Sequence, residues 1–190
     1  MKRPLHPPPT ERLRFDTWTE SDGALAISLW THPEVMRHMG GAMTEAGALE
    51  RMRREIDRQQ RYGIQYWPIF LREAGLRETD PCEAELRANA RFAGCCGLRP
   101  FHEDATIFEL GVHLAHPCWS LRLGEEAARA VIDFAFTVLD ASLLVAGHGP
   151  ENANSQALIE RLGFIYSHHS PWGEQQILHP IYRLEPVRQV

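Results

Sequence analysis

The sequence feature that most constrains the fold is a strand, a turn, a long helix and a second strand that follow one another between residues 106 and 146. Residues 106–114 have the pattern of a strand, and residues 125–139 hold the best helical pattern of the chain. The apolar stripe of that helix is formed by Leu123, Ala127, Val131, Phe134 and Val138. Residues 143–146 are a short apolar run, typical of a buried strand. The order predicts a strand-helix-strand unit.

Further elements are predicted on both sides of this unit. The additional strands are expected over residues 12–18, 66–71, 91–98, 164–168 and 176–184. Residues 73–90 are polar and contain Gly75 and Pro81, so they are expected to form an elongated, partly helical hairpin connection. A meander of strands joined to a strand-helix-strand unit predicts a mixed α/β (α+β) sheet with helices on both faces.

Three further helices are predicted from caps and stops. The first begins near Ser21 and Asp22 and stops at His32-Pro33, the second begins at Thr44, and the third runs over 152–162, between an Asn152 cap and Gly163. Leu49, Met52 and Ile56 give the second helix its apolar spacing. We expect its charged face to be solvated surface, formed by Glu50, Arg53, Arg54, Glu55 and Arg58.

Length and charge exclude several classes of protein. A chain of 190 residues suits one domain with a single core. Residues 1–9 are expected to be a flexible, Pro-rich segment, and residues 10–190 to form that domain. The net charge is -5, so no broad basic face for nucleic acid is expected. No apolar run is long enough to span a membrane and no secretory signal is evident, which predicts a cytoplasmic protein without a membrane partner.

Cysteine and histidine usage argues against a disulfide scaffold and against a metal site. The four cysteines are too few for such a scaffold, and the adjacent Cys95 and Cys96 should point to opposite faces of a strand. None of the ten histidines belongs to an HExxH motif, and His168 and His169 diverge on a strand. We therefore expect no metal.

The turn before the long helix is the first candidate binding site. Such a turn exposes unpaired backbone N–H groups at the positive end of a helix dipole, which suits a phosphate or pyrophosphate. The signal is weak alone, because every strand-to-helix turn has free amides and this one carries neither GxxxxGK[ST] nor GxGxxG. A plain connection remains open at this point.

Two longer segments are more specific. Residues 119–136 are WSLRLGEEAARAVIDFAF, and residues 151–164 are ENANSQALIERLGF. They resemble motifs A and B of the GNAT superfamily of acyl-CoA-dependent N-acyltransferases, and most of all its branch of ribosomal-protein N-terminal acetyltransferases. GCCGL at 94–98 and ELGV at 109–112 resemble two strands of that branch. The resemblance covers residues 10–184, and the matching motif residues are Trp119, Gly124, Glu126, Ala127, Ala128, Asp133, Phe134, Phe136, Asn152, Ser155, Leu162, Gly163 and Phe164.

The resemblance implies a GNAT-like fold, with a mostly antiparallel sheet splayed into a V at the acyl-CoA site. It implies acetyl-CoA as the cofactor and direct transfer of the acetyl group to a primary amine in a ternary complex. Backbone N–H groups near Val112 and Leu114 would then hold the thioester carbonyl. The other cofactor-binding positions that it implies are Trp119, Ser120, Leu121, Arg122, Leu123, Gly124, Glu125, Asn152 and Ser155.

Two departures from the family pattern raise specific questions. Ser120 and Arg122 replace glycines of the loop, so that Arg122 either contacts a phosphate or obstructs the close approach of the backbone. Ile159 stands where many members carry a tyrosine acid. Ser155 then becomes the candidate that protonates the leaving thiolate, as in the branch that this chain resembles.

Glu109 and His113 are the candidate bases, because residues at period two share one face of a strand and both would look into a cleft at its end. Each candidate has a structural alternative. Glu109 could form a cross-strand salt bridge, His113 could be a satisfied sheet histidine, and Ser155 could bond only the backbone. Asn152 is first an N-cap, and Trp119 first a packing residue.

The expected function is N-acetylation of a primary amine, with a protein N-terminal α-amine as the first choice of acceptor and a small-molecule amine as the second. The rival interpretation is a catalytically silent acyl-CoA-binding regulatory module. A third is a structural domain whose loop binds nothing. The sequence leaves open the acceptor, the acyl chain length and the oligomeric state, a homodimer included.

Overall fold

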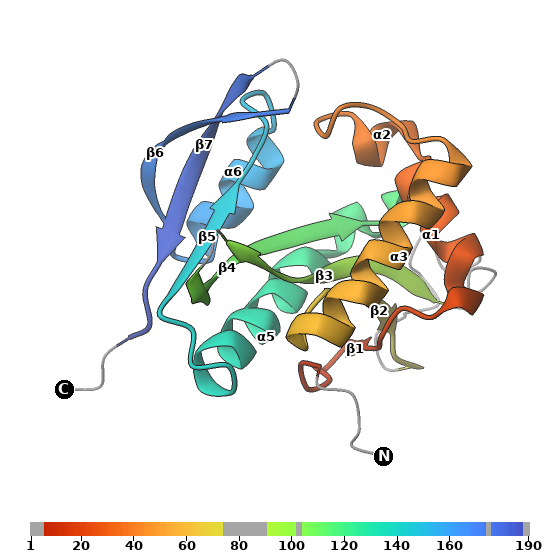
Figure 1. Cartoon of the computed structure of the whole chain (residues 1–190), viewed down its shortest axis with the longest axis horizontal. Coiled ribbons are helices and arrows are strands. Elements are labelled where there is room, and N and C mark those ends of the chain that lie inside the picture. The colour runs from red at the N-terminus through yellow and green to blue at the C-terminus, as the bar shows by residue number, and fades with distance from the viewer. Residues whose placement is uncertain (1–5, 74–90, 102–103, 174–175, 188–190) are drawn as a thin grey trace.

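A seven-stranded sheet in the order β1-β2-β3-β4-β5-β7-β6 is the frame of the described part of the chain (Figure 1). The computed structural model describes residues 6–73, 91–101, 104–173 and 176–187. The strands are β1 (Leu13–Phe15), β2 (Tyr66–Leu71), β3 (Phe92–Phe101), β4 (Asp104–Leu114), β5 (Leu143–Gly147), β6 (Ile165–Trp172) and β7 (Ile177–Leu184). Among these strands the neighbours are antiparallel except for β4 and β5, which are parallel. The predicted mixed, mostly antiparallel sheet is confirmed.

Two helices, α3 and α6, begin at residues whose side chains cap the first turn. The helical elements are η1 (Glu20–Asp22), α1 (Gly23–Trp30), α2 (Pro33–Met36), α3 (Glu45–Tyr62), η3 (His116–Leu121), α5 (Leu123–Thr137) and α6 (Ala153–Arg161). The Thr44 hydroxyl accepts from the Gly47 amide at the start of α3, and Asn152 accepts from the Ser155 amide at the start of α6. Gly163, at φ 91°, follows α6 in the left-handed conformation that was expected of it.

The sheet has an apolar core on each face. One core packs α5 and α6 against the sheet and includes Cys96, Leu98 and Leu110. The other packs α1, α2 and α3 and includes Cys95, Tyr66 and Trp30. Helices therefore cover both faces, and the adjacent cysteines point to opposite faces, as the sequence predicted.

Two glycines in the central strands allow an unusually close approach of neighbours. A Cβ built on Gly97 would lie 2.0 Å from the backbone oxygen of Gln65, just before β2. A Cβ built on Gly111 would lie 2.3 Å from the Tyr66 ring. The glycine of the ELGV segment therefore makes room for a buried aromatic ring against β4.

Several sequence expectations need correction. Glu55 was expected on a solvated face but is only 3% exposed, because its carboxylate accepts from the Tyr66 amide at 2.8 Å and pairs with Arg58. Asp22 directly precedes α1 without capping it, since its carboxylate accepts instead from Thr19. The turn after β4 contains η3, and α2 follows α1; neither was anticipated. The expected hairpin connection over 73–90 lies almost wholly outside the described residues.

Candidate active site

The parallel pair β4 and β5 separates partway along its length. Pairing runs from Ile107 with Leu143 to Glu109 with Val145 and then stops. Beyond that point β4 continues to Leu114 beside β3, while β5 continues to Gly147 beside β7 (Figure 1). The edge of β4 that faces β5 therefore has no strand partner from residue 110 onward, and this edge includes Val112 and Leu114. The splayed V that the resemblance implied is present.

The chain leaves this open edge through a turn that ends in an uncapped helix. Arg122, the residue before α5, is left-handed at φ 56°, and its side chain makes no capping hydrogen bond. The first backbone N–H groups of α5 therefore lack both an intrahelical partner and a cap. A Cβ on Gly124 would meet the ends of Leu114 and Val112 at 3.2 and 3.6 Å, so the start of α5 packs directly on the open part of β4.

The turn itself is held by contacts on both sides. The Trp119 indole N–H donates to the Leu114 carbonyl at 3.0 Å, although the side chain is 41% exposed. Arg12 donates to the Leu121 carbonyl at 3.0 Å, and Leu123 is fully buried. These contacts fix the backbone of the turn, and Leu123 offers a ligand only its backbone. Ser120 lies in η3, and its side chain is outside the described part of the structure.

Positive charge is in excess at the start of α5. Glu125 is surrounded by Arg122 at 3.2 Å, Arg129 at 3.0 Å and Arg161 at 3.5 Å. Hydrogen bonds from Arg129 and Arg122 lower the pKa of the Glu125 carboxyl, so it stays ionised. Three positive charges around one negative charge, next to free helix amides, suit a polyanionic ligand. These residues fit the diphosphate of an acyl-CoA.

The start of α6 lies beside this turn. Leu158 of α6 approaches Gly124 of α5, and Ser155 lies one helical turn earlier on the same side of α6. The Ser155 hydroxyl has no hydrogen-bond partner among the described residues, whereas Asn152 uses its side-chain oxygen as the N-cap. Ile159 is buried in the core. The arrangement leaves the Ser155 hydroxyl and the Asn152 amide N–H groups available to a ligand.

The opposite face of β4 carries a partly buried cluster of polar and aromatic side chains, which we call the α3-side cluster. Glu109 accepts from Arg99 through both carboxylate oxygens, at 2.9 and 2.6 Å. His113 is 7% exposed and stands edge-on to Tyr66, with the two ring centroids 5.6 Å apart. The complete cluster consists of Trp30, Arg51, Tyr66, Arg99, Glu109 and His113. Glu109 and His113 thus share one face, as the period of two predicted, and Glu109 forms the cross-strand ion pair that was its structural alternative.

The protonation state of His113 follows from its contacts. The Trp30 indole N–H donates to His113 Nδ1 at 3.0 Å, so Nδ1 carries the lone pair. Burial, and then the charges of Arg51 and Arg99, hold the pKa of His113 well below its ordinary value. His113 is a neutral imidazole whose basic nitrogen is already occupied, which makes it a poor proton acceptor. The structural alternative for His113 is thus the better description of its contacts.

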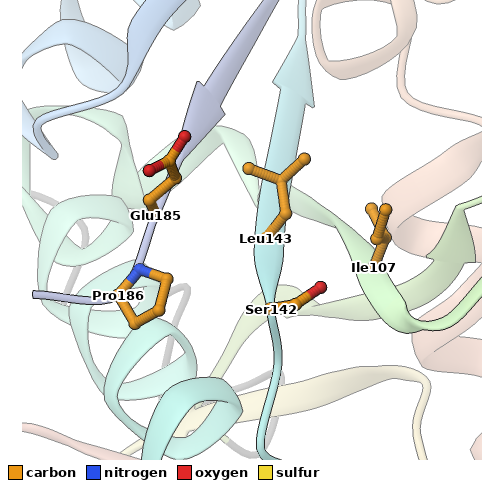
Figure 2. Close-up of a pocket in the computed structure, with 5 residues that line it drawn as sticks. All are labelled: Ile107, Ser142, Leu143, Glu185 and Pro186. Atoms are coloured by element: carbon orange, nitrogen blue, oxygen red, sulfur yellow. The ribbon is translucent and has the colours of Figure 1, made fainter. Parts of the chain in front are cut away.

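The surface hollow drawn in Figure 2 lies away from both groups. It is lined by residues from the beginning of β5, from β4 and from the chain after β7, namely Ile107, Ser142, Leu143, Glu185 and Pro186. At this end of β5 the two parallel strands are still paired. The hollow contains no residue of the turn, of α6 or of the α3-side cluster.

Sequence reasoning missed three kinds of residue here. Arg129 has a readable signal, because it lies four residues after Glu125 on one helix. Arg161 has none, since its contact depends on how α5 and α6 pack. Trp30 and Arg51 were missed because nothing local connects α1 and α3 to His113. Among the described residues no group of three or more His, Cys, Asp or Glu side chains is arranged to hold a metal ion.

A sheet that parts beside an uncapped, positively charged helix start is the arrangement that the resemblance to acyl-CoA-dependent acyltransferases implied. Residues 12–165 match the sequence profile of the acetyltransferase (GNAT) domain, and this chain belongs to that family. Its acyl donor is accordingly acetyl-CoA. The described helices include none that is long and apolar enough to cross a membrane.

Comparison with individual proteins agrees with this assignment. The uncharacterized N-acetyltransferase p20 of Bacillus licheniformis is 26% identical over 157 residues, which cover 82% of this chain and 80% of that protein. The fold is similar to an acetyltransferase from Agrobacterium tumefaciens strain C58, with a TM-score of 0.74, 21% identity and 98% coverage of both chains. It is also similar to RimL, a ribosomal L7/L12 α-N-protein acetyltransferase solved with coenzyme A, with a TM-score of 0.72, 13% identity and coverage of 93% and 95%.

Proposed function

We propose that this chain transfers an acetyl group from acetyl-CoA to a primary amine by direct attack within a ternary complex. The observation that carries the proposal is the parting of β4 from β5 directly beside the uncapped start of α5. A diphosphate bound at the helix start would place the thioester arm along the open edge of β4. The acceptor would then approach from the face of β4 that α5 does not cover, where the α3-side cluster lies.

We assign the donor-side contacts to the turn and to the start of α6. Backbone N–H groups of the turn and of the first turn of α5, with Arg122, Arg129 and Arg161, would hold the phosphates. Backbone N–H groups at Val112 to Leu114 would hold the carbonyl oxygen as negative charge develops on it. Asn152 would add its amide N–H groups. These roles rest on the uncapped backbone of α5 and on the excess positive charge of the three arginines around Glu125.

Ser155 is the proposed acid. As the amine nitrogen forms its bond to the acetyl carbon and the carbon–sulfur bond breaks, the Ser155 hydroxyl would protonate the leaving thiolate. The proton that the nitrogen loses would pass through water and restore the serine. Of the two candidate bases we favour Glu109, because its carboxylate retains lone pairs beside Arg99 whereas Nδ1 of His113 is occupied.

The acceptor is proposed to be a protein N-terminal α-amine, with a small-molecule amine as the second choice. An α-amino group has a pKa of about 8, against about 10.4 for lysine, so a larger share is neutral and able to attack near pH 7. The similarity to RimL, whose described target is a ribosomal protein N-terminus, supports this order.

The test is thiol release from acetyl-CoA with a panel of amines that contains N-terminal peptides, small amines and a lysine peptide blocked at its N-terminus. We expect release that depends on the amine and is faster with α-amines at pH 7. Tight binding of CoA without turnover on any amine would instead favour the silent regulatory module. The absence of both binding and a thermal shift with CoA would favour a purely structural domain.

A further inference from the structure

Arg51 differs from the other arginines of the α3-side cluster and its surroundings because it has no carboxylate partner. Arg99 is paired with Glu109, and Arg58 is paired with Glu55. Among the described residues, Arg51 makes neither an ion pair nor a hydrogen bond to an oxygen atom. The N–H donors of its guanidinium that do not lie against His113 are therefore available to a ligand.

The surroundings of the Arg51 guanidinium are aromatic. It lies over the Trp30 ring at 4.9 Å from the ring centroid, and its Nη2 is 3.5 Å from both ring nitrogens of His113. Equal distances to both nitrogens place Nη2 over the face of the imidazole, since Nδ1 already accepts from Trp30. The two rings hold the guanidinium in place without neutralising it.

The charge balance leaves one cation uncompensated. Within the described ranges, Arg51, Arg58 and Arg99 face two carboxylates, Glu55 and Glu109, which are paired with Arg58 and Arg99. His113 is neutral, and burial raises the pKa of Tyr66, so neither supplies a compensating charge. Burial lowers the pKa of Arg51, because desolvation disfavours the charged guanidinium. A partly buried guanidinium without a carboxylate partner among the described residues suits an anion.

The position of Arg51 indicates which ligand would supply the anionic group. Arg51 touches His113, which lies on β4 beyond the point where β4 and β5 separate. It lies on the face of β4 opposite α5, so it is not available to the phosphates at the start of that helix. The side chain is partly exposed and can be reached from solvent.

We propose that Arg51 receives a carboxylate of the acyl acceptor, so that the enzyme selects amines that carry an acidic group near the reacting nitrogen. This inference rests on the proposed function, because the acceptor is assigned to this face of β4. A guanidinium binds a carboxylate through two parallel hydrogen bonds, which also orients the acceptor. The acidic group would belong either to a side chain close to a peptide N-terminus or to a small amino acid.

The test compares acceptors that differ only in this charge. The peptide pair is Ser-Asp-Gly-Gly-amide against Ser-Asn-Gly-Gly-amide, and the small-molecule pair is β-alanine against β-alaninamide. We expect the acidic member of at least one pair to have the higher kcat/KM, by about 10- to 100-fold, the range of a hydrogen bond to a charged group. The pair that shows the preference identifies the source of the carboxylate.

Substitutions of Arg51 test whether the preference for acidic acceptors depends on this residue. Arg51→Gln should remove it, mainly through the KM for the acceptor, and Arg51→Lys should retain part of it. Arg54→Gln is the matched control, because Arg54 lies on the same helix but is exposed, and it should keep the full preference. An equal kcat/KM for acidic and neutral acceptors in the wild-type protein, or a preference that survives Arg51→Gln, would overturn the inference.

A second readout separates this inference from the proposed function. The same four compounds are titrated by calorimetry into protein saturated with CoA, which reports binding without acetyl transfer. Binding of the acidic compound that depends on Arg51, without any turnover, would support the inference and contradict the proposed function. Turnover that is equally fast with acidic and neutral acceptors would support the proposed function and contradict the inference. If the acidic compounds neither bind nor react, the inference fails.

Discussion

The two ends of the proposed reaction path are built in opposite ways. At the start of α5 the groups that can bind a ligand are backbone amides and mostly exposed arginines, whose charges surround one partly exposed carboxylate. In the α3-side cluster they are side chains packed between β4 and two helices, where every charge except that of Arg51 is paired. A substitution at the start of α5 should therefore change the affinity for CoA by a small factor. A substitution in the α3-side cluster should also change the free energy of unfolding.

The largest expected effect tests this difference with two glycines. Gly111→Ala places a Cβ 2.3 Å from the buried Tyr66 ring, whereas the nearest atom to a Cβ on Gly124 is the end of the flexible Leu114 side chain at 3.2 Å. Overpacking should lower the free energy of unfolding by about 2–3 kcal/mol for Gly111→Ala. The better helix propensity of alanine should keep Gly124→Ala within about 1 kcal/mol of wild type. Urea unfolding measures both, and equal losses would contradict the contrast between the two ends.

Ser155 provides the second test, at the donor end. Ser155→Ala should lower kcat by roughly 10²-fold, the lower end of what a positioned proton donor contributes. The affinity for acetyl-CoA should change far less. Asn154→Ala is the control, because Asn154 is exposed one residue earlier on α6. Steady-state kinetics separates the two parameters, and an unchanged kcat would remove Ser155 from the catalytic residues.

The third test uses the protonation of His113. Because the folded protein holds the pKa of His113 well below 6.5, the unfolded chain binds a proton below that pH that the folded chain does not bind. The free energy of unfolding should therefore fall as the pH drops below about 6.5, by up to ~1.4 kcal/mol per pH unit. Burial also lowers the pKa of His179, which adds a contribution of the same sign.

His113→Asn isolates this effect. The asparagine oxygen can still accept from the Trp30 indole, but the side chain no longer titrates. The slope of unfolding free energy against pH, measured by urea unfolding between about pH 5.5 and 7.5, should become shallower. His179 remains in both proteins and does not affect the comparison. Parallel slopes would mean that His113 is protonated in the folded state.

The smallest expected effect concerns Arg122. Arg122→Gly removes a side chain from a left-handed position and should raise stability by about 0.5–1 kcal/mol. It should also weaken CoA binding several-fold, because one of the three arginines around Glu125 is lost. Asp140→Gly is the matched control, since Asp140 is left-handed at φ 51° and lies after α5. Calorimetry with CoA decides the role of the arginine: tighter binding by Arg122→Gly would show that it obstructs.

Local patterns predicted the elements well. The apolar stripe of α5 from Leu123 to Phe134, the caps Thr44 and Asn152 and the left-handed Gly163 depend on neighbours within a few residues, and the structure confirms them. Val138, which was predicted to end that stripe, follows the helix instead and is 50% exposed. The motif resemblance located the turn and the start of α6, because those positions are close in sequence to the groups that they act with. Roles within the site remain predictions.

Contacts between distant elements could not be predicted. Glu55 looks like part of a charged helix face, and it is buried because β2 begins beneath it and presents an unpaired amide. Arg99 and Glu109 are ten residues apart, and only the register of β3 with β4 sets them opposite each other. Arg51 reaches His113 across 62 residues. Arg51, Arg99, Glu109 and His113 belong to the proposed acceptor end, and their contacts depend on how distant elements pack, so the sequence did not identify which residues would select the acceptor.

The most direct test of the central claim is hydrogen exchange of the backbone amides, followed by mass spectrometry with and without saturating CoA. The account predicts slower exchange in residues 119–126, at the turn and the start of α5, and in residues 112–114 on the open edge of β4. Unchanged exchange in both segments at saturating CoA, or protection centred on the hollow of Figure 2, would contradict it.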